Sequence, residues 1–271
     1  MCSTLSHIFP PDCVFNTAYD KIIPYIFQQV NHLPEQLEFI TVTLVQVIAS
    51  AVHGAIGYGS VIISAPLFVL INPAYLPGPA LFASIFLSIL MALRERQQLD
   101  FWGLKWVLAG RIPSGFLAAY LLAIIPQDQI SFVFGLMILF AVGISLLGVR
   151  FPPYRWIMVI AGIFSGIMGT IAAIGGPPVA LIYQDAPGPK LRSTMSGFFI
   201  VGAGFSLVAL IPVGKYGIQE MGYSFAMIPG TLIGFLISRK IVPFLDKGYT
   251  RSAILLISAL SAAFVIGKQI F

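Results

Sequence analysis

Long uninterrupted runs of apolar residues restrict the fold of this chain more than any other feature. Runs such as 104–125 and 250–268 are long enough to cross about 30 Å of hydrocarbon as helices. Of the 271 residues, 58% are apolar and 9% are charged, whereas a soluble domain carries about 25% charged residues. The runs do not alternate between polar and apolar residues as barrel strands do. The sequence therefore predicts an all-α polytopic membrane protein.

Two stretches interrupt this helical pattern with glycine and proline. They read HGAIGYGSVIISAPLF (53–68) and SGIMGTIAAIGGPPVAL (165–181). Both residue types destabilise a helix, and backbone groups that are freed inside lipid find no water. Irregular backbone at membrane depth is tolerated where it lines a cavity or is buried in protein. We therefore expect two discontinuous helices, with breaks at 53–60 and 165–177.

The two stretches belong to an internal repeat. At an offset of 112 residues, the segment 47–86 is identical to the later segment at Val47, Ile48, Ala49, Gly54, Gly57, Ile62, Pro66, Ala74, Pro77, Ser84 and Phe86. Glycines and prolines are among these matches, and chance hydrophobicity does not align them. The sequence thus predicts an extracytoplasmic leader (1–37) and two transmembrane repeats (38–150 and 151–271).

Each repeat is expected to begin with a glycine-broken helical hairpin, followed by three spanning helices. The hairpins are predicted at 38–56 with 60–72 and at 155–171 with 175–186. The other spans are predicted at 79–95, 104–125, 129–149, 192–213, 222–243 and 250–268. The prediction therefore comprises eight long spans and two short segments.

Basic residues predict the orientation of the repeats, because lysine and arginine gather in cytoplasmic loops. They cluster in the loop 94–105, the connector 150–155, the loop 190–192 and the loop 239–251. Placing these inside puts both termini on the extracytoplasmic side of the inner (cytoplasmic) membrane. The two halves are then inverted, a layout common in secondary transporters. The sequence leaves open whether the short segments cross or re-enter.

The paired breaks predict a substrate site. A half-helix that begins after each break would point its positive N-terminal end at the same region near the midplane, which suits an anion. The residues expected to contact the anion are those of the two breaks: Gly54, Gly57, Tyr58, Gly59, Ser60, Gly169, Thr170, Gly175, Gly176 and Pro178. The alternative is that these glycines only allow close helix packing.

Arg111 is the one charge inside a long predicted span. A planar guanidinium suits the oxygens of an oxyanion, so Arg111 is a candidate substrate contact. Snorkelling to the interface or a structural pair is the alternative. His53 is either a packed neutral residue or a proton carrier. Other polar residues near the breaks either contact ligand or satisfy freed backbone and helix contacts: Gln46, Asn72, Ser84, Tyr183, Gln184, Thr194 and Ser196.

Several functional classes are disfavoured by what the sequence lacks. No carboxylate lies in mid-span, and no nucleotide loop, metal cluster or nucleophile–base pair is present. We therefore expect no enzyme activity, no cofactor and no metal. The net charge of +5 fits basic cytoplasmic loops better than nucleic-acid binding. Cys2 and Cys13 lie in the leader, and the sequence does not decide whether they are bonded. The expected partners are a small anion and the lipid bilayer; a homodimer is left open.

The duplicated block resembles one transporter family. Its G-x-x-G turn, its proline-containing apolar segment and the basic residues before LDFWGLKW (99–106) are similar to those of the sulfite/sulfonate exporter family TauE/SafE. The resemblance covers nearly the whole chain after residue 38. It implies export of sulfite or of an organosulfonate such as sulfoacetate. The sequence departs from the pattern at GYGSV, where many relatives have a glycine run, so Tyr58 and Ser60 add side chains there. Uptake of another small organic anion and a non-transporting scaffold are the alternatives.

Overall fold

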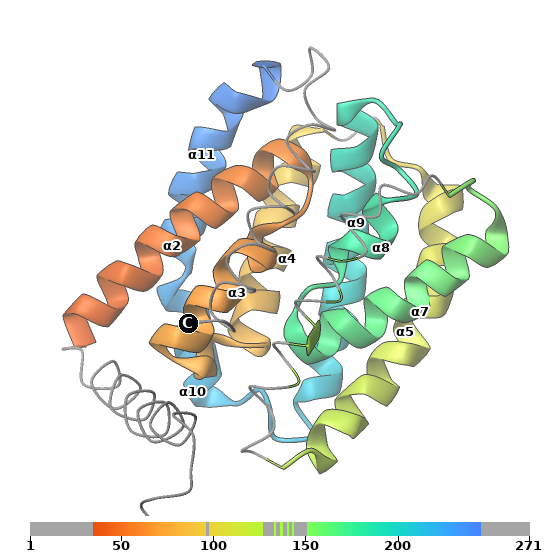
Figure 1. Ribbon diagram of the computed structural model, residues 1–271. Helices are drawn as coiled ribbons and strands as arrows, with labels where there is room; N and C mark the ends of the chain where they lie inside the picture. Colours follow the sequence, from red (N-terminus) through yellow and green to blue (C-terminus); the bar gives the residue numbers. More distant parts are fainter. Residues whose placement is uncertain are drawn as a thin grey trace, which may run out of the picture.

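The computed structural model describes residues 35–95, 98–126 and 151–244, together with a few helical residues between 133 and 143. Regular structure in this part of the chain is entirely helical (Figure 1). The α-helices are α2 (Glu35–Ile56), α3 (Ser60–Ile71), α4 (Gly78–Arg94), α5 (Phe101–Ile124), α7 (Arg155–Ala172), α8 (Gly176–Ala180), α9 (Gly188–Leu210), α10 (Ile218–Ala226) and α11 (Ile228–Phe244), with a 3-10 turn η1 (Pro73–Tyr75).

The described helices are long and apolar enough to make this a multi-pass membrane protein. Five segments qualify as spans by length and composition: Gln36–Ile56, Phe101–Ile124, Arg155–Ala172, Gly188–Leu210 and Ile218–Phe244. Large apolar side chains stay exposed on their outer faces, for example Leu44 and Ile48 on α2 and Leu236 on α11. Such faces suit lipid rather than water.

Not every predicted span has the expected form. Helix α4 has 17 residues and is shorter than α2, α5, α7 and α9, and it is not among the five segments that qualify as spans. The span predicted at 222–243 is divided at Met227 into α10 and α11, since Pro229 has no N–H to donate to the carbonyl of Phe225. The predicted span 250–268, most of 129–149 and most of the leader 1–37 lie outside the described residues.

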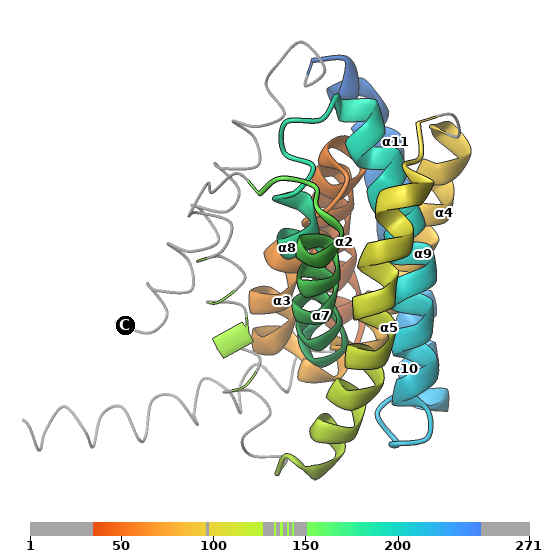
Figure 2. The same ribbon diagram turned by 90° about the vertical axis from the view of Figure 1, so that its right-hand side faces the viewer.

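Three extensive helix pairs hold the described body together. Helix α2 runs along α11, α5 runs along α7, and α4 packs against α9 (Figures 1 and 2). Glycines allow the first two approaches: Gly234 lies against the carbonyl of Val47, and Gly162 lies against the carbonyl of Val107. This close packing of small residues is characteristic of helices that associate in membranes.

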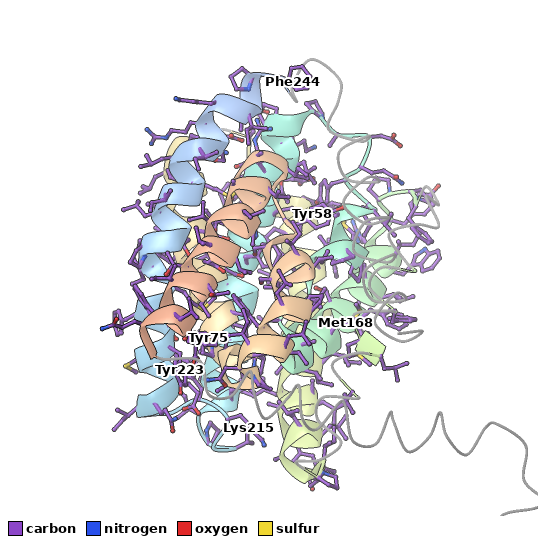
Figure 3. All side chains as sticks on the ribbon, turned by 60° about the vertical axis from the view of Figure 1, so that its left-hand side comes forward. Tyr58, Tyr75, Met168, Lys215, Tyr223 and Phe244 are labelled. Carbon is purple, nitrogen blue, oxygen red and sulfur yellow. The ribbon has the colours of Figure 1, made fainter. Side chains whose placement is uncertain are left out.

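The start of α10 and the end of α11 lie far apart. Figure 3 shows Phe244, the last residue of α11, at one end of the molecule, and Lys215, which precedes α10, at the other. Near the Lys215 end the ring of Tyr75 in η1 lies 4.9 Å from the ring of Tyr223 in α10. Helices α10 and α11 together therefore extend along the full length of the body.

Both predicted breaks are present, but they differ. The first is a tight turn in which Gly57 and Gly59 have φ angles of 114° and 108°, and the 12-residue α3 follows it. The second passes through Ala173 in the left-handed region and leads into α8, which has only five residues. After Ala180 the chain tightens into turns, with the N–H of Tyr183 donating to the carbonyl of Ala180. The expectation of one continuous short apolar segment over 175–186 is therefore wrong.

Candidate functional site

The two breaks meet in the interior of the molecule. A Cβ at Gly176 would lie 3.0 Å from the Tyr58 ring, so only a glycine lets the second break approach the first so closely. Figure 3 shows Tyr58 within the helical body. Beside this contact is a cavity of about 10 Å³, roughly the space of one water molecule. It is lined by residues of both breaks and of the helices behind them: His53, Gly59, Ser60, Val61, Ile62, Ser84, Ala173, Ile174, Gly176, Pro177 and Phe199.

His53 forms the polar wall of the cavity on the first break. Its Nδ1 lies 2.7 Å from the hydroxyl of Ser60, which begins α3, so the side chain joins the two helices across the turn. The imidazole is 1% exposed and packs 5.1 Å from the ring of Phe199. Its Nε2 has no hydrogen-bond partner among the described residues. The histidine is thus packed in the interior with one ring nitrogen still available to a ligand.

Arg111 reaches the second break from α5. Its Nη1 donates to the backbone oxygen of Ser165 at 2.9 Å and to the Ser165 hydroxyl at 2.8 Å. The Ser165 hydroxyl in turn donates to the carbonyl of Gly175, the residue before α8. The guanidinium also lies 4.4 Å from the centre of the Phe198 ring. A relay of hydrogen bonds therefore ties Arg111 to the tip of the second hairpin.

Glycines form the socket that holds this guanidinium. A Cβ at Gly169 would lie 2.8 Å from Nη1, and Cβ atoms at Gly175 and Gly202 would come closer still. Arg111 is 1% exposed, so the snorkelling alternative is wrong: the side chain ends in protein, not at the interface. Its Nε and Nη2 have no hydrogen-bond partner, and it has no ion pair, within the described ranges.

The predicted site residues therefore divide into two groups. His53, Gly59, Ser60 and Gly176 line the cavity, and Tyr58 closes it against Gly176. Gly169 and Gly175 lie behind the cavity wall, against Arg111, which itself does not line the cavity.

The remaining predicted residues lie elsewhere. Gly54 and Gly57 face Ser238 and Arg192. Thr170 bonds to the Ser206 hydroxyl at 2.8 Å, and Pro178 lines a separate apolar groove. None of these four residues lines the cavity; Gly54, Gly57 and Thr170 pack against neighbouring helices, and Pro178 faces the separate groove.

One predicted source of positive charge is missing from the second break. Two backbone N–H groups at the start of α8 are absent because Pro177 and Pro178 occupy those positions. A five-residue helix also has almost no dipole to direct at a ligand. The expectation that each break presents a helix N-terminus to an anion is therefore wrong for the second break, where the charge of Arg111 lies instead.

The other polar residues singled out in the sequence mostly join helices. Gln46 donates to Thr231 at 2.9 Å and holds α2 to α11. Asn72 donates to Glu38 at 3.0 Å and holds the end of α3 to α2, whereas Ser196 donates to the carbonyl of Arg192 within α9. Ser84 is the exception, since it lines the cavity. Gln184 has an interaction of its own and is not free.

Asp100 ties the start of α5 to the second hairpin. It accepts from the N–H of Gly103 at 3.0 Å and from the hydroxyl of Tyr183 at 3.2 Å, and it pairs with Lys190 at 3.6 Å. Its backbone N–H also donates to the hydroxyl oxygen of Thr194 at 3.1 Å. Desolvation by burial acts to raise the pKa of Asp100, but the Gly103 N–H, Lys190 and Tyr183 outweigh it, so the pKa lies below its ordinary value.

Sequence reasoning missed the apolar part of the site and a charged cluster beside it. Ile62, Ile174 and Phe199 line the cavity. Ile62 and Ile174 are equivalent positions of the repeat, which is the sequence signal that could have singled them out, whereas nothing in its sequence context separates Phe199 from other apolar residues. Arg94 and Arg192 appeared only as markers of cytoplasmic loops, although both contact the first break. The repeated Gly57, which packs against Arg192, was a signal that could have drawn attention to that arginine, and nothing in the sequence marked Arg94 in the same way.

Comparisons with known proteins identify the family of the chain. The family model for the sulfite exporter TauE/SafE matches residues 42–265, which is most of the chain. No curated protein and no solved structure matched the chain. The chain therefore belongs to the sulfite exporter TauE/SafE family and is a multi-pass membrane transporter.

Proposed function

We propose that this chain exports sulfite, or a small organosulfonate such as sulfoacetate, across the cytoplasmic membrane through the cavity where the two breaks meet. Family membership supports export of a sulfur oxyanion. The observation that carries the proposal is Arg111: a fully buried guanidinium lies directly behind the cavity wall and has no carboxylate partner in the described part of the chain. A buried cation without a counter-ion is costly, and an anionic substrate would offset that cost.

In this proposal Arg111 and the cavity act together. The guanidinium binds Ser165, and Ser165 binds Gly175, whose neighbours Ile174 and Gly176 line the cavity. The N–H groups of two of its nitrogens, Nε and Nη2, remain free for oxyanion oxygens once the Gly175 tip shifts. On the opposite wall His53 and Ser60 offer polar atoms to the same anion.

The helix pairing supports two inverted repeats. Under the 112-residue offset α2 corresponds to α7, and the later match of 112–117 with 228–233 makes α5 correspond to α11. The pairs α2 with α11 and α5 with α7 are then equivalent, and each joins the broken hairpin of one half to a helix of the other. With the basic loops inside and both termini outside, an interior-negative potential drives an anion outward by about 2.3 kcal/mol per charge per 100 mV.

The proposal is tested with purified protein in liposomes and by calorimetric titration with sulfite, sulfoacetate and acetate. Arg111→Ala is expected to weaken sulfite binding by roughly ten- to hundredfold, since a hydrogen bond to a charged group contributes about 1.5–3 kcal/mol. Arg111→Lys keeps the charge but loses the planar guanidinium, so its affinity for sulfite should lie between those of the wild type and of Arg111→Ala.

The matched control is Arg155→Ala, which removes an arginine that lies on the Trp106 ring at the surface. It should bind and transport as the wild type does. Failure of the wild-type protein to move either sulfur anion would refute the proposed function. Unchanged affinity for sulfite in a folded Arg111→Ala protein would show that Arg111 does not bind the substrate.

A further inference from the structure

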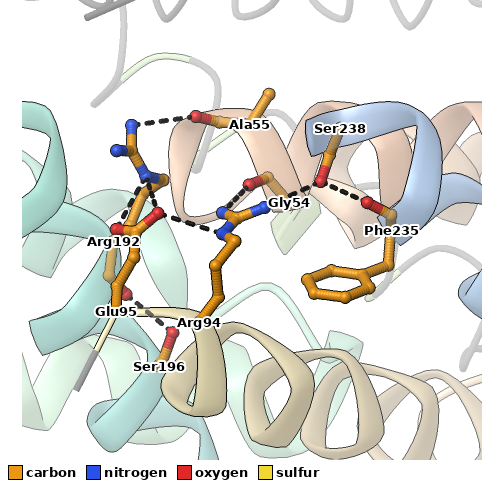
Figure 4. Close-up of polar contacts among 8 residues, drawn as sticks. All are labelled: Gly54, Ala55, Arg94, Glu95, Arg192, Ser196, Phe235 and Ser238. Atoms are coloured by element: carbon orange, nitrogen blue, oxygen red, sulfur yellow. Dashed lines mark hydrogen bonds and ion pairs between the residues drawn. The ribbon is translucent and has the colours of Figure 1, made fainter. Parts of the chain in front are cut away.

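A second arrangement of charges lies at the end of α4, next to the first break (Figure 4). The carboxylate of Glu95 accepts from Nε of Arg192 at 2.7 and 2.9 Å, and from Nε of Arg94 at 3.1 Å. The side chains of Arg192, Glu95 and Arg94 are 1%, 12% and 16% exposed. Two guanidinium groups from different halves of the chain therefore share one carboxylate in a largely buried place.

Among the described residues that form this cluster, positive charge exceeds negative charge. The two arginines and one glutamate carry a net charge of +1. A third guanidinium, that of the exposed Arg239 on α11, lies 5.0 Å from the centre of the Phe235 ring, and the largely buried Arg94 lies 5.3 Å from the centre of the same ring. Buried cations need anions close by. The surroundings therefore favour an additional or alternative anion.

The protein holds both arginines in position independently of Glu95. Arg94 donates to the carbonyl of Gly54 at 2.6 Å and to the hydroxyl of Ser238 at 3.1 Å. Arg192 donates to the carbonyl of Ala55 at 3.4 Å. These acceptors lie on α2 and α11, so the two Nε–H groups would keep their direction if the carboxylate left. This is a preorganised receptor for an oxyanion with at least two oxygens.

Glu95 is the part of the cluster that can leave. It follows the last residue of α4 and is the helix C-cap, with φ −126° and ψ 52°. Its carboxylate oxygens bind only the two arginines among the described residues. Rotation of this one side chain would therefore expose both Nε–H groups without moving a helix.

The cluster adjoins the candidate substrate cavity. A Cβ at Gly57 would lie 3.1 Å from Cα and 3.3 Å from Cγ of Arg192, so the turn of the first break rests directly on this arginine. The next residues of the turn, Tyr58 and Gly59, close and line the cavity. Only the backbone turn of the first break would thus separate an anion held by the arginines from the cavity.

We infer that Arg94 and Arg192 form a second anion site, in which the Glu95 carboxylate is a tethered occupant that a small oxyanion replaces on its way to or from the cavity. The inference rests on the proposed function in one respect, that the transported substrate is such an oxyanion. The proposed topology places this site on the cytoplasmic side of the cavity. Glu95 then keeps the site filled, and the two halves joined, while no substrate is present.

The test uses the full-length protein in nanodiscs, titrated with sulfite, sulfate and acetate by calorimetry and by thermal unfolding. Glu95→Gln removes the competing charge, so the oxyanions should bind about tenfold more tightly than to the wild type. Their addition should also raise the unfolding temperature more in Glu95→Gln than in the wild type. The gain should disappear in the double variant Glu95→Gln/Arg192→Gln. Glu38→Gln, which neutralises a carboxylate bonded to Asn72, is the matched control and should show no gain.

The shorter side chain of Glu95→Asp provides a second test that preserves the charge. It cannot reach both Nε–H groups as Glu95 does, so an intermediate gain of about threefold is expected. No gain in either variant, or a gain that survives the loss of Arg192, would overturn the second site. These readouts do not require transport. A protein that gains affinity but moves no sulfur anion would refute the proposed function and leave the site standing, and the reverse result would refute only the site.

Discussion

The two breaks arise from the same repeated sequence pattern, yet they differ in backbone conformation and in the helix that follows. The first break has two left-handed glycines and leads into the 12-residue α3. The second leads through Ala173 into a five-residue helix that starts with two prolines. An arginine from the other half supports each break: Arg192 lies against Gly57, and Arg111 lies against Gly169 and Gly175.

The difference between the two breaks lies in how that arginine is neutralised. Arg192 binds Glu95, whereas Arg111 has no carboxylate partner in the described residues. Identical glycines at Gly57 and Gly169 therefore face a compensated charge in one half and an uncompensated charge in the other. A repeated backbone can thus produce one break held by an ion pair and one break ready for an anion.

The largest expected effect comes from filling the space that the two glycines leave. Gly57→Leu places a side chain at φ 114° against the backbone of Arg192, and Gly169→Leu displaces the Arg111 guanidinium. Each change should abolish sulfite transport in liposomes, because both breaks must keep their arginine contact. Gly204→Leu on α9 is the control, since a Cβ there meets nothing within 4 Å. Normal transport by both variants would show that the breaks do not form the pathway.

A smaller effect is expected from the hydrogen-bond relay that only the second break has. Ser165→Ala removes one acceptor of Arg111 and the donor to Gly175. Sulfite affinity should fall by about three- to tenfold, in line with about 1 kcal/mol for one net hydrogen bond. Ser206→Ala breaks a bond of the same kind to Thr170 without touching the relay. Equal affinities in the two variants would mean that the relay does not hold the arginine for the anion.

The smallest effect concerns Asp100, which anchors only the second hairpin. Because its pKa is lowered in the folded protein, its charge stabilises the fold above the ordinary Asp pKa of about 4, and this stabilisation is lost as the pH falls through the lowered folded pKa. Asp100→Asn keeps a good N-cap for α5 and removes only the charge. Its unfolding temperature should lie a few degrees below that of the wild type at pH 7, with the gap closing below about pH 4. A difference in unfolding temperature that does not change with pH would refute stabilisation by the charge of Asp100.

Much of the architecture was predictable because it depends on local properties. Hydropathy alone indicated helices that cross a membrane, and the described spans agree with this prediction. Glycine and proline content located both breaks, since these residues disfavour a helix wherever they occur. The family was also recognisable from the repeated block, and the family match over residues 42–265 confirms it. The sizes of α8 and of the α10–α11 pair were less predictable, because prolines break helices to an extent that depends on packing.

The surroundings of the charged residues were decided only by the tertiary structure. Sequence position made Arg111 a candidate, but its socket of Gly169, Gly175 and Gly202 comes from three separate segments. In the same way, the sequence assigned Arg94 and Arg192 to cytoplasmic loops, but the structure places both in a largely buried cluster around Glu95. A helix determines which residues share a face, but the faces that meet depend on how all the helices pack. The sequence by itself thus determined that this chain spans a membrane with two broken helices, and the packing of those helices decided which charges are neutralised and which remain for an anion.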